Sequence, residues 1–229
     1  PLPPFPDMSN VPNMHDLPFL KAKYDMTTFD EVLVKSSNDF MDKSKRDGKP
    51  FFIWHNTTRM HVWTFLSKKY SAMQNHESNY GLEEAGMAQL DDSVGALLKH
   101  IDDIGETNNT IVIFTTDNGA EVFTWPDGGM TPFKATKGTS FEGGFRVPAI
   151  IRWPGRVKPG SVENGIMSGL DWFPTLVAAA GNPNITDQLL KGVGGEGNPV
   201  GGQALAHQPR HVTRFILIGG DDGAGLFDP

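Results

Sequence analysis

Residues 110–119 read Thr-Ile-Val-Ile-Phe-Thr-Thr-Asp-Asn-Gly, a short apolar run that ends in a carboxylate, a carboxamide and a glycine. The middle of the run is entirely apolar, which is typical of a strand covered on both faces. In an open parallel sheet, ligands bind just beyond the carboxyl ends of the strands. Asp117 and Asn118 would supply hard oxygen donors for Ca²⁺ or Mg²⁺ there. Asp-Asn-Gly also suits a tight turn, so the local sequence leaves turn and metal site both open.

Further elements are predicted on both sides of this strand. Apolar residues at helical spacing predict one helix from Thr27 or Thr28 to Gly48 and another over residues 82–104. Strands are predicted at 51–54, where the run is expected to be buried, and at 147–152. Ser168 and Asp171 have the spacing of a capping box for a helix that ends near Ala180. Strand, helix and strand over 51–116 predict a parallel βαβ unit, and the fold class is therefore α/β.

The chain divides by composition into a domain and a tail. We expect residues 1–191 to form one domain, in which the proline-rich residues 1–25 are a connector. Residues 192–229 contain ten glycines and are predicted to be poorly specified, with disorder an open option. Within this tail, Phe215-Ile216-Leu217-Ile218 is the one run that is typical of a strand.

Charge and cysteine content exclude several kinds of function. The net charge of −7 argues against a nucleic-acid partner or an anionic membrane surface. No run approaches the roughly 18 apolar residues that cross a bilayer. The absence of cysteine excludes disulfides, thiolate metal sites and a cysteine nucleophile. The compartment stays open, between cytoplasm and periplasm if the source is bacterial, and so does the oligomeric state.

Two further segments carry candidate functional residues. Lys137 opens a glycine-rich loop over residues 137–146, where missing side chains would let the lysine approach an anion closely. A flexible surface loop is the alternative. His61 follows the strand at 51–54 and could donate a proton to a leaving group or hold an anion, with His55 as its competitor.

Together, these segments resemble the sulfatase family, and the likeness covers roughly residues 25–185. The motifs that carry it are Thr57-Thr58-Arg59-Met60-His61, Thr116-Asp117-Asn118-Gly119, Lys137-Gly138-Thr139-Ser140-Phe141-Glu142-Gly143-Gly144-Phe145-Arg146-Val147-Pro148, Trp153-Pro154-Gly155 and Leu170-Asp171-Trp172-Phe173-Pro174-Thr175. The resemblance implies an alkaline-phosphatase-like sandwich with a mostly parallel central sheet, and an arylsulfatase-like hydrolase of small-molecule sulfate esters. It implies that Asp117 and Asn118 bind a divalent cation, usually Ca²⁺ and alternatively Mg²⁺. It also assigns sulfate binding to Lys137, in preference to Lys134, and a place near the leaving-group oxygen to His61.

The sequence departs from the family where the nucleophile is expected. Family members use a formylglycine made from the cysteine or serine of a Cys/Ser-x-Pro-x-Arg segment, and this chain contains neither a cysteine nor Ser-x-Pro-x-Arg. The family's early Asp-Asp ligands and its Gly-Lys-x-x-His segment are expected to lie upstream of residue 1. We therefore expect a sheet that is incomplete on its N-terminal side and a fragment without activity. The alternatives are a phosphatase or phosphodiesterase of the same superfamily, and a non-catalytic remnant with weak metal or partner binding.

Overall fold

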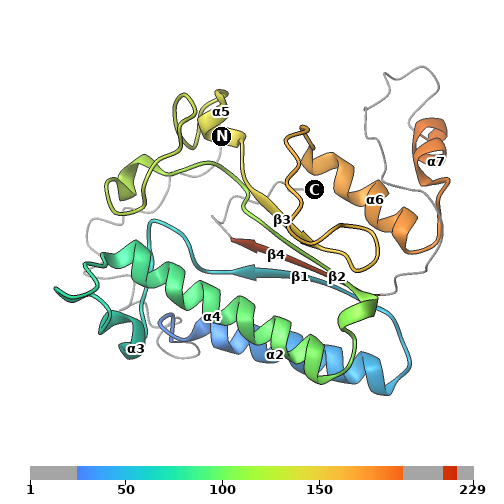
Figure 1. The fold of residues 1–229 in the computed structure, drawn as a ribbon, viewed down its shortest axis with the longest axis horizontal. Helices are drawn as coiled ribbons and strands as arrows, with labels where there is room; N and C mark the ends of the chain where they lie inside the picture. Colours follow the sequence, from blue (N-terminus) through green and yellow to red (C-terminus); the bar gives the residue numbers. More distant parts are fainter. Residues whose placement is uncertain (1–24, 193–213, 221–229) are drawn as a thin grey trace, which may run out of the picture.

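A mixed four-stranded sheet runs through the computed structural model, which describes residues 25–192 and 214–220 (Figure 1). The strands lie in the order β1 (Phe51–Thr57), β4 (Arg214–Gly220), β2 (Thr110–Thr115) and β3 (Ala149–Arg152). β1, β4 and β2 are parallel, and β3 is antiparallel to β2. The prediction of an α/β fold with a mostly parallel sheet is confirmed.

The position of β4 could not be predicted from local sequence. β1 and β2 are parallel, as predicted, but they are not neighbours, because β4 from the C-terminal tail pairs with both of them. Phe51 and Thr110 are each paired with Arg214, so the three strands start in register. The centre of the described sheet is thus filled by the strand predicted at Phe215–Ile218. The remainder of the tail and residues 1–24 of the predicted connector lie outside the described residues.

Two long helices cover one face of the sheet side by side (Figure 1). α2 (Phe29–Arg46) has Asp30 and Glu31 in its first turn and three basic residues in its last, as the helix dipole favours. It ends before Gly48, whose φ of +64° suits a glycine. α4 (Leu82–Asp103) ends close to the predicted Ile104. Thr28 occupies the N-cap position of α2, but its side chain makes no capping bond.

The remaining elements are short. The predicted capping box of Ser168 and Asp171 is present, but it opens a 3₁₀ turn that leads into the helix α6. The other short elements are α3 (Lys68–Ser71), η2 (Thr107–Asn109), η3 (Val122–Thr124), α5 (Glu142–Phe145), η4 (Gly169–Asp171), α6 (Trp172–Ala179) and α7 (Ile185–Gly192). No helix among residues 25–192 has both the length and the apolar character needed to cross a membrane.

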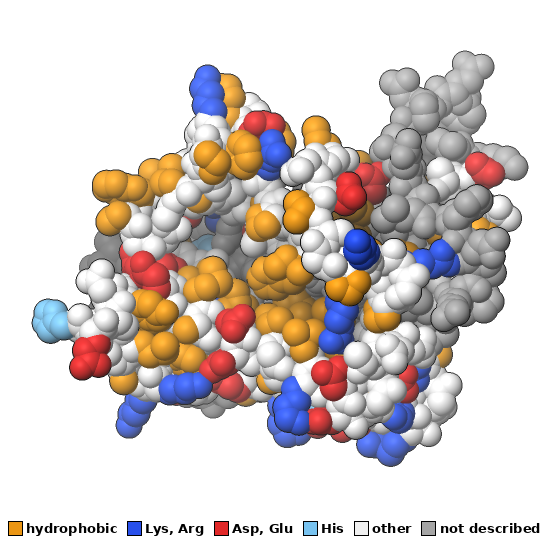
Figure 2. All heavy atoms as spheres, viewed as in Figure 1, with side chains coloured by type: hydrophobic (Ala, Val, Ile, Leu, Met, Phe, Trp, Pro, Cys, Tyr) orange, Lys and Arg blue, Asp and Glu red, His pale blue; other side chains and the backbone are white. Residues whose placement is uncertain are grey.

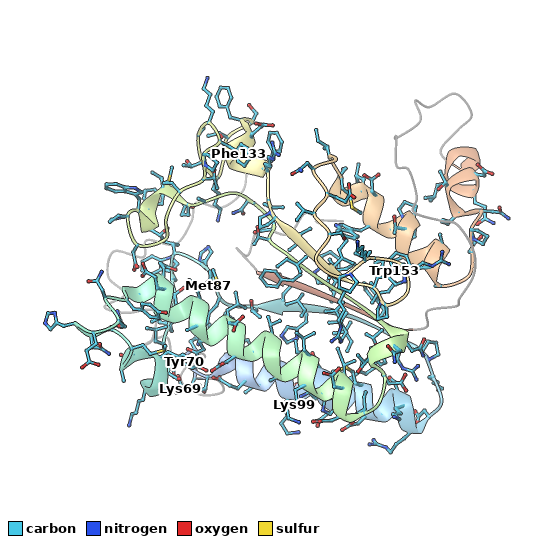
Figure 3. The ribbon with its side chains drawn as sticks, in the orientation of Figure 1. Lys69, Tyr70, Met87, Lys99, Phe133 and Trp153 are labelled. Atoms are coloured by element: carbon cyan, nitrogen blue, oxygen red, sulfur yellow. The ribbon has the colours of Figure 1, made fainter. Side chains whose placement is uncertain are left out.

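The sheet has a hydrophobic core on each face. The larger core joins α2 and α4 to the sheet through Met41, Leu97 and Ile101, none of which is exposed. The smaller core joins Ile111 and Ile113 to α6, and Trp153, labelled in Figure 3, packs against it. β2 is therefore covered on both faces along its first four residues, as its apolar run predicts.

β1 differs from the prediction of a buried strand. Its side chains alternate between buried and exposed along all seven residues, so only the face towards α2 and α4 is covered. Phe52 and Trp54 are 51% and 53% exposed on the opposite face. The four apolar residues of the predicted run, 51–54, cannot reveal this alternation, because the uncovered face is as apolar there as the covered one.

Neighbouring phenylalanines in β1 provide a direct test of this packing. Phe51→Ala should lower the free energy of unfolding by about 3–5 kcal/mol, because Phe51 is 4% exposed and lies in the larger core. Phe52→Ala is the matched control and should change the free energy by less than about 1 kcal/mol. Denaturant unfolding followed by far-UV circular dichroism measures both. Equal losses would contradict the assignment of faces.

Candidate functional site

The carboxyl ends of β1, β4 and β2 meet at one edge of the sheet. Thr57 is paired with Gly220, and Thr115 with Gly219, so the strands end nearly level. The segment after β1 carries His61, and the segment after β2 carries Asp117 and Asn118. Asp221 and Asp222 follow β4 in the sequence and lie outside the described residues. The segments that carry the predicted proton donor and the predicted metal ligands therefore leave the sheet at the same edge.

Asp117 and Asn118 lie in a turn directly after β2. The Thr116 hydroxyl donates to the backbone carbonyl of Asn118 at 3.1 Å, and the side-chain Nδ2 of Asn118 donates to the backbone carbonyl of Gly119 at 3.0 Å. Asp117 is exposed, and Asn118 is half-buried. The backbone bends at Asp117-Asn118-Gly119, and this conformation is compatible with a metal site because Asp117 is exposed.

Close backbone packing joins this turn to the glycine-rich loop. The Gly119 N–H donates to the Gly144 carbonyl at 2.9 Å, and the Gly143 N–H donates to the Lys134 carbonyl at 2.8 Å. A Cβ at Gly119 would overlap the Gly143 carbonyl, and one at Gly143 would overlap the Ala135 carbonyl. Gly119 and Gly143 therefore permit contact between backbones, a role in addition to the approach to an anion that was predicted for the glycines of residues 137–146. Figure 1 shows the loop and α5 above the edge of the sheet.

The same packing places Lys137 beside the Asp-Asn-Gly turn. The Lys137 N–H donates to the Ala120 carbonyl at 3.0 Å. Its Nζ lies 3.8 Å from Glu121 Oε2, and both side chains are 22% exposed. Lys134, the other lysine of the loop, instead lies over the ring of Phe141 at 4.0 Å. The structure thus brings together three of the four predicted site residues, Asp117, Asn118 and Lys137, on adjoining loops.

The two candidate histidines have different environments. His55 is 3% exposed, and its Nδ1 lies 2.9 Å from the Ser37 hydroxyl. Burial lowers the pKa of His55, against the opposing attraction of Asp30. His55 is therefore a core histidine on the α2 side of β1. His61 is half-buried beyond the strand, and its carbonyl accepts a bond of 2.7 Å from the Thr64 hydroxyl.

A buried ion pair fixes the segment that leads to His61. Arg59 is 1% exposed and donates to Asp30, which is fully buried, at 2.6 Å. The Asp30 carboxylate also accepts bonds of 2.8 and 2.9 Å from the backbone and hydroxyl of Thr58. The second guanidinium nitrogen donates to the carbonyls of Thr27 and Phe65, both at 2.8 Å. These bonds hold the chain on both sides of His61 against the start of α2.

Removal of the Asp30 charge should destabilise the folded protein. Asp30→Asn should lower the free energy of unfolding by about 3–5 kcal/mol, because it leaves the buried Arg59 guanidinium without its counter-ion. Asp39→Asn is the control, since its pair with Lys35 at 2.5 Å is solvent-exposed, and it should cost less than about 0.5 kcal/mol. Guanidinium unfolding curves measure both changes. Similar costs for the two variants would show that the buried pair is not the anchor of this segment.

A cluster of carboxyl groups lies at the start of α4, and no motif in the sequence indicated it. The Glu83 N–H donates to Asp127 Oδ2 at 3.0 Å, and the Gly81 N–H donates to Glu84 Oε2 at 2.9 Å. Burial, helped by the charges of Asp127 and Glu84, raises the pKa of Glu83 to about 7, despite a hydrogen bond with Thr64. Burial also acts to raise the pKa of Asp127, but hydrogen bonds with Glu84 and with the amides of Glu83 and Leu82 outweigh it and lower the pKa. Within this cluster, Glu83 is thus the carboxyl group whose pKa is raised, so it stays protonated below about pH 7.

The raised pKa makes stability depend on pH. The folded protein keeps a proton on Glu83 up to about pH 7, whereas the unfolded chain releases it near the ordinary value of 4.5. As far as Glu83 is concerned, the free energy of unfolding should therefore be highest below about pH 4.5 and should fall as the pH rises from there through 7.

The variant Glu83→Gln isolates this contribution, because its side chain is neutral at every pH. It should match the parent near pH 4 and be more stable at pH 8. The exposed Glu77→Gln should follow the parent at both values. Urea unfolding at the two pH values measures the difference, and a parent-like loss of stability in Glu83→Gln would contradict the assignment.

The described residues supply only part of a metal shell. Asp117 and Asn118 have donor types that fit Ca²⁺, which takes six to eight oxygens. Within residues 25–192 and 214–220, no group of three His, Cys, Asp or Glu side chains could hold a metal ion. The donor types therefore agree with the predicted site, while the donor number falls short of a complete one.

Comparisons with known proteins identify the family to which this chain is similar. The family model described as Sulfatase matches residues 4–182. Arylsulfatase A of Bos taurus is 34% identical over 220 residues, which are 92% of this chain and 38% of that protein. N-acetylgalactosamine-6-sulfatase of Homo sapiens is 33% identical over 165 residues, 71% of this chain and 31% of that protein. The crystal structure of the PsFucS1 sulfatase from Pseudoalteromonas sp. superposes with a TM-score of 0.60 at 34% identity, and covers 65% of this chain and 29% of that one. This chain thus spans about a third of the length of these relatives.

Proposed function

Because the chain belongs to the sulfatase family of sulfuric ester hydrolases, we propose that it forms part of the catalytic domain of an arylsulfatase-like enzyme. The observation that supports this most directly is the joining of two motifs at one edge of the sheet. The Asp-Asn-Gly turn and the Lys137 loop are tied by the bonds Gly119 to Gly144 and Lys137 to Ala120. A sulfate ester bound there would meet a metal-binding pair and a cation from adjoining loops.

The proposed roles follow from the charge that develops as a sulfate ester is cleaved. A bound Ca²⁺, or Mg²⁺ in its place, would polarise the sulfate oxygens as a Lewis acid. Asp117 and Asn118 would contribute oxygen donors to that ion. The Lys137 ammonium would bind a sulfate oxygen, where negative charge increases in the transition state. His61, held by the Arg59 network, would place its ring near the leaving-group oxygen and supply a proton to it.

The isolated 229-residue chain is proposed to be inactive. It contains neither cysteine nor Ser-x-Pro-x-Arg from which formylglycine could form, and two described donors make a weak metal site. The substrate class of the proposed enzyme is a small-molecule sulfate ester, and the alcohol half of the ester stays unassigned.

Two measurements on this chain test the proposal. Hydrolysis of 4-nitrophenyl sulfate with added Ca²⁺ should not exceed that of Lys137→Ala, because both chains lack the precursor of the nucleophile. Calorimetric titration should show Ca²⁺ binding weaker than micromolar, which Asp117→Asn weakens further. Turnover clearly above the Lys137→Ala control would overturn the proposed inactivity. Micromolar or tighter binding would contradict the two-donor site and require donors from outside the described residues.

A further inference from the structure

Glu121 carries an interaction that the proposed function does not use. Its carboxylate Oε2 lies 3.8 Å from the Nζ of Lys137, the proposed sulfate-binding group. The two residues are 16 positions apart, and both side chains are only 22% exposed. By contrast, the pairs Lys35–Asp39 and Lys99–Asp103 lie one helical turn apart, with all four side chains 56–74% exposed. The Glu121–Lys137 pair is therefore built by the fold of two loops.

The backbone fixes this pair on both sides. The Lys137 N–H donates to the carbonyl of Ala120, the residue directly before Glu121. The other carboxylate oxygen, Oε1, accepts from the Phe123 N–H at 3.5 Å and caps the 3₁₀ turn η3. At 3.8 Å, the contact with Lys137 is an attraction between charges that is longer than a hydrogen bond. A ligand that offers direct hydrogen bonds to the ammonium can therefore compete with it.

We propose that Glu121 is a specificity-determining residue that favours esters with one negative charge over esters with two, an inference that rests on the proposed role of Lys137. With Glu121 beside it, the lysine is part of a pair whose net charge is zero. Every negative charge that a ligand brings to Lys137 is repelled by the carboxylate a few ångströms away. A sulfate monoester brings one charge, whereas a phosphate monoester brings nearly two above its second pKa of about 6.

The electrostatic argument gives a quantitative relation between two ligands. If the repulsion from Glu121 weakens binding of a monoanion by some factor, the doubled charge weakens binding of a dianion of the same shape by the square of that factor. 4-Nitrophenyl sulfate and 4-nitrophenyl phosphate are such a pair of probes at pH 7.5. Glu121→Gln removes the charge and keeps an amide oxygen that can still cap η3.

Binding of the two esters, measured by calorimetry or by NMR titration, tests the inference. In Glu121→Gln, affinity for the sulfate ester should rise about fivefold and affinity for the phosphate ester about 25-fold. Glu142→Gln is the matched control, because Glu142 lies in the same loop region and pairs instead with Arg146 at 3.3 Å. It should leave both affinities unchanged. Thermal melts show whether the variants fold, and Glu121→Ala is the second neutral variant if the glutamine one does not.

The results of these measurements distinguish a failure of this inference from a failure of the proposed function on which it rests. Equal affinities of Lys137→Ala and the parent for both esters would overturn the proposed role of Lys137 and the inference with it. If Lys137→Ala weakens binding, but Glu121→Gln leaves it unchanged, weakens it, or raises both affinities by the same factor, the inference alone is wrong. A larger gain for the phosphate ester than for the sulfate ester supports it.

Discussion

The buried pair of Arg59 and Asp30 is the constraint on which the placement of the first half of the chain depends. A guanidinium with 1% exposure and a carboxylate with none are stable only together, because each would be an unpaired buried charge without the other. The pair joins the start of α2 to the end of β1. Gln89 of α4 extends the same network by donating to Thr27 and Glu31 at 3.0 and 2.9 Å. Two helices and a strand therefore share one polar anchor beneath the segment that carries His61.

A second constraint, which is steric, acts on the segments that follow β2 at this edge of the sheet. The backbone of the Asp-Asn-Gly turn contacts the backbone of α5, where a side chain at Gly119 would overlap the Gly143 carbonyl. Side chains at Gly143 or Gly144 would overlap atoms of residues 134–139, which precede α5. This packing holds the Lys137 loop against the turn that carries Asp117. Figure 2 shows hydrophobic side chains on the surface of these loops, and Phe123 and Trp125 of this region are 81% and 64% exposed. The loops are thus ordered by backbone contacts while their apolar side chains face outward.

The local sequence predicted well which helices and strands form, but it predicted poorly which strands pair with one another. The ends of α2 and α4, and the strand β2, follow from glycines, apolar spacing and a continuous apolar run, all of which act within a few residues. The place of β4 between β1 and β2 depends on pairing across more than 100 residues. The roles of His55 and Glu83 depend on burial by distant segments. Asp117, Asn118 and Lys137 were candidates from their local sequence, and the resemblance to a family implied their roles. The reason that their loops need glycine became visible only in the structure.

α4 links the two halves of the edge, although it carries none of the proposed site residues. Its first turn is bonded to Asp127, which lies on the stretch between β2 and the Lys137 loop. One turn later, Gly86 allows close contact with Thr64 and Met60, which flank His61. Gln89 then accepts a bond of 3.3 Å from Ser67 and joins the Arg59 network. Since successive turns of one helix hold the segment around His61 and the stretch that leads to the Lys137 loop, the packing of α4 constrains how these two segments lie relative to each other.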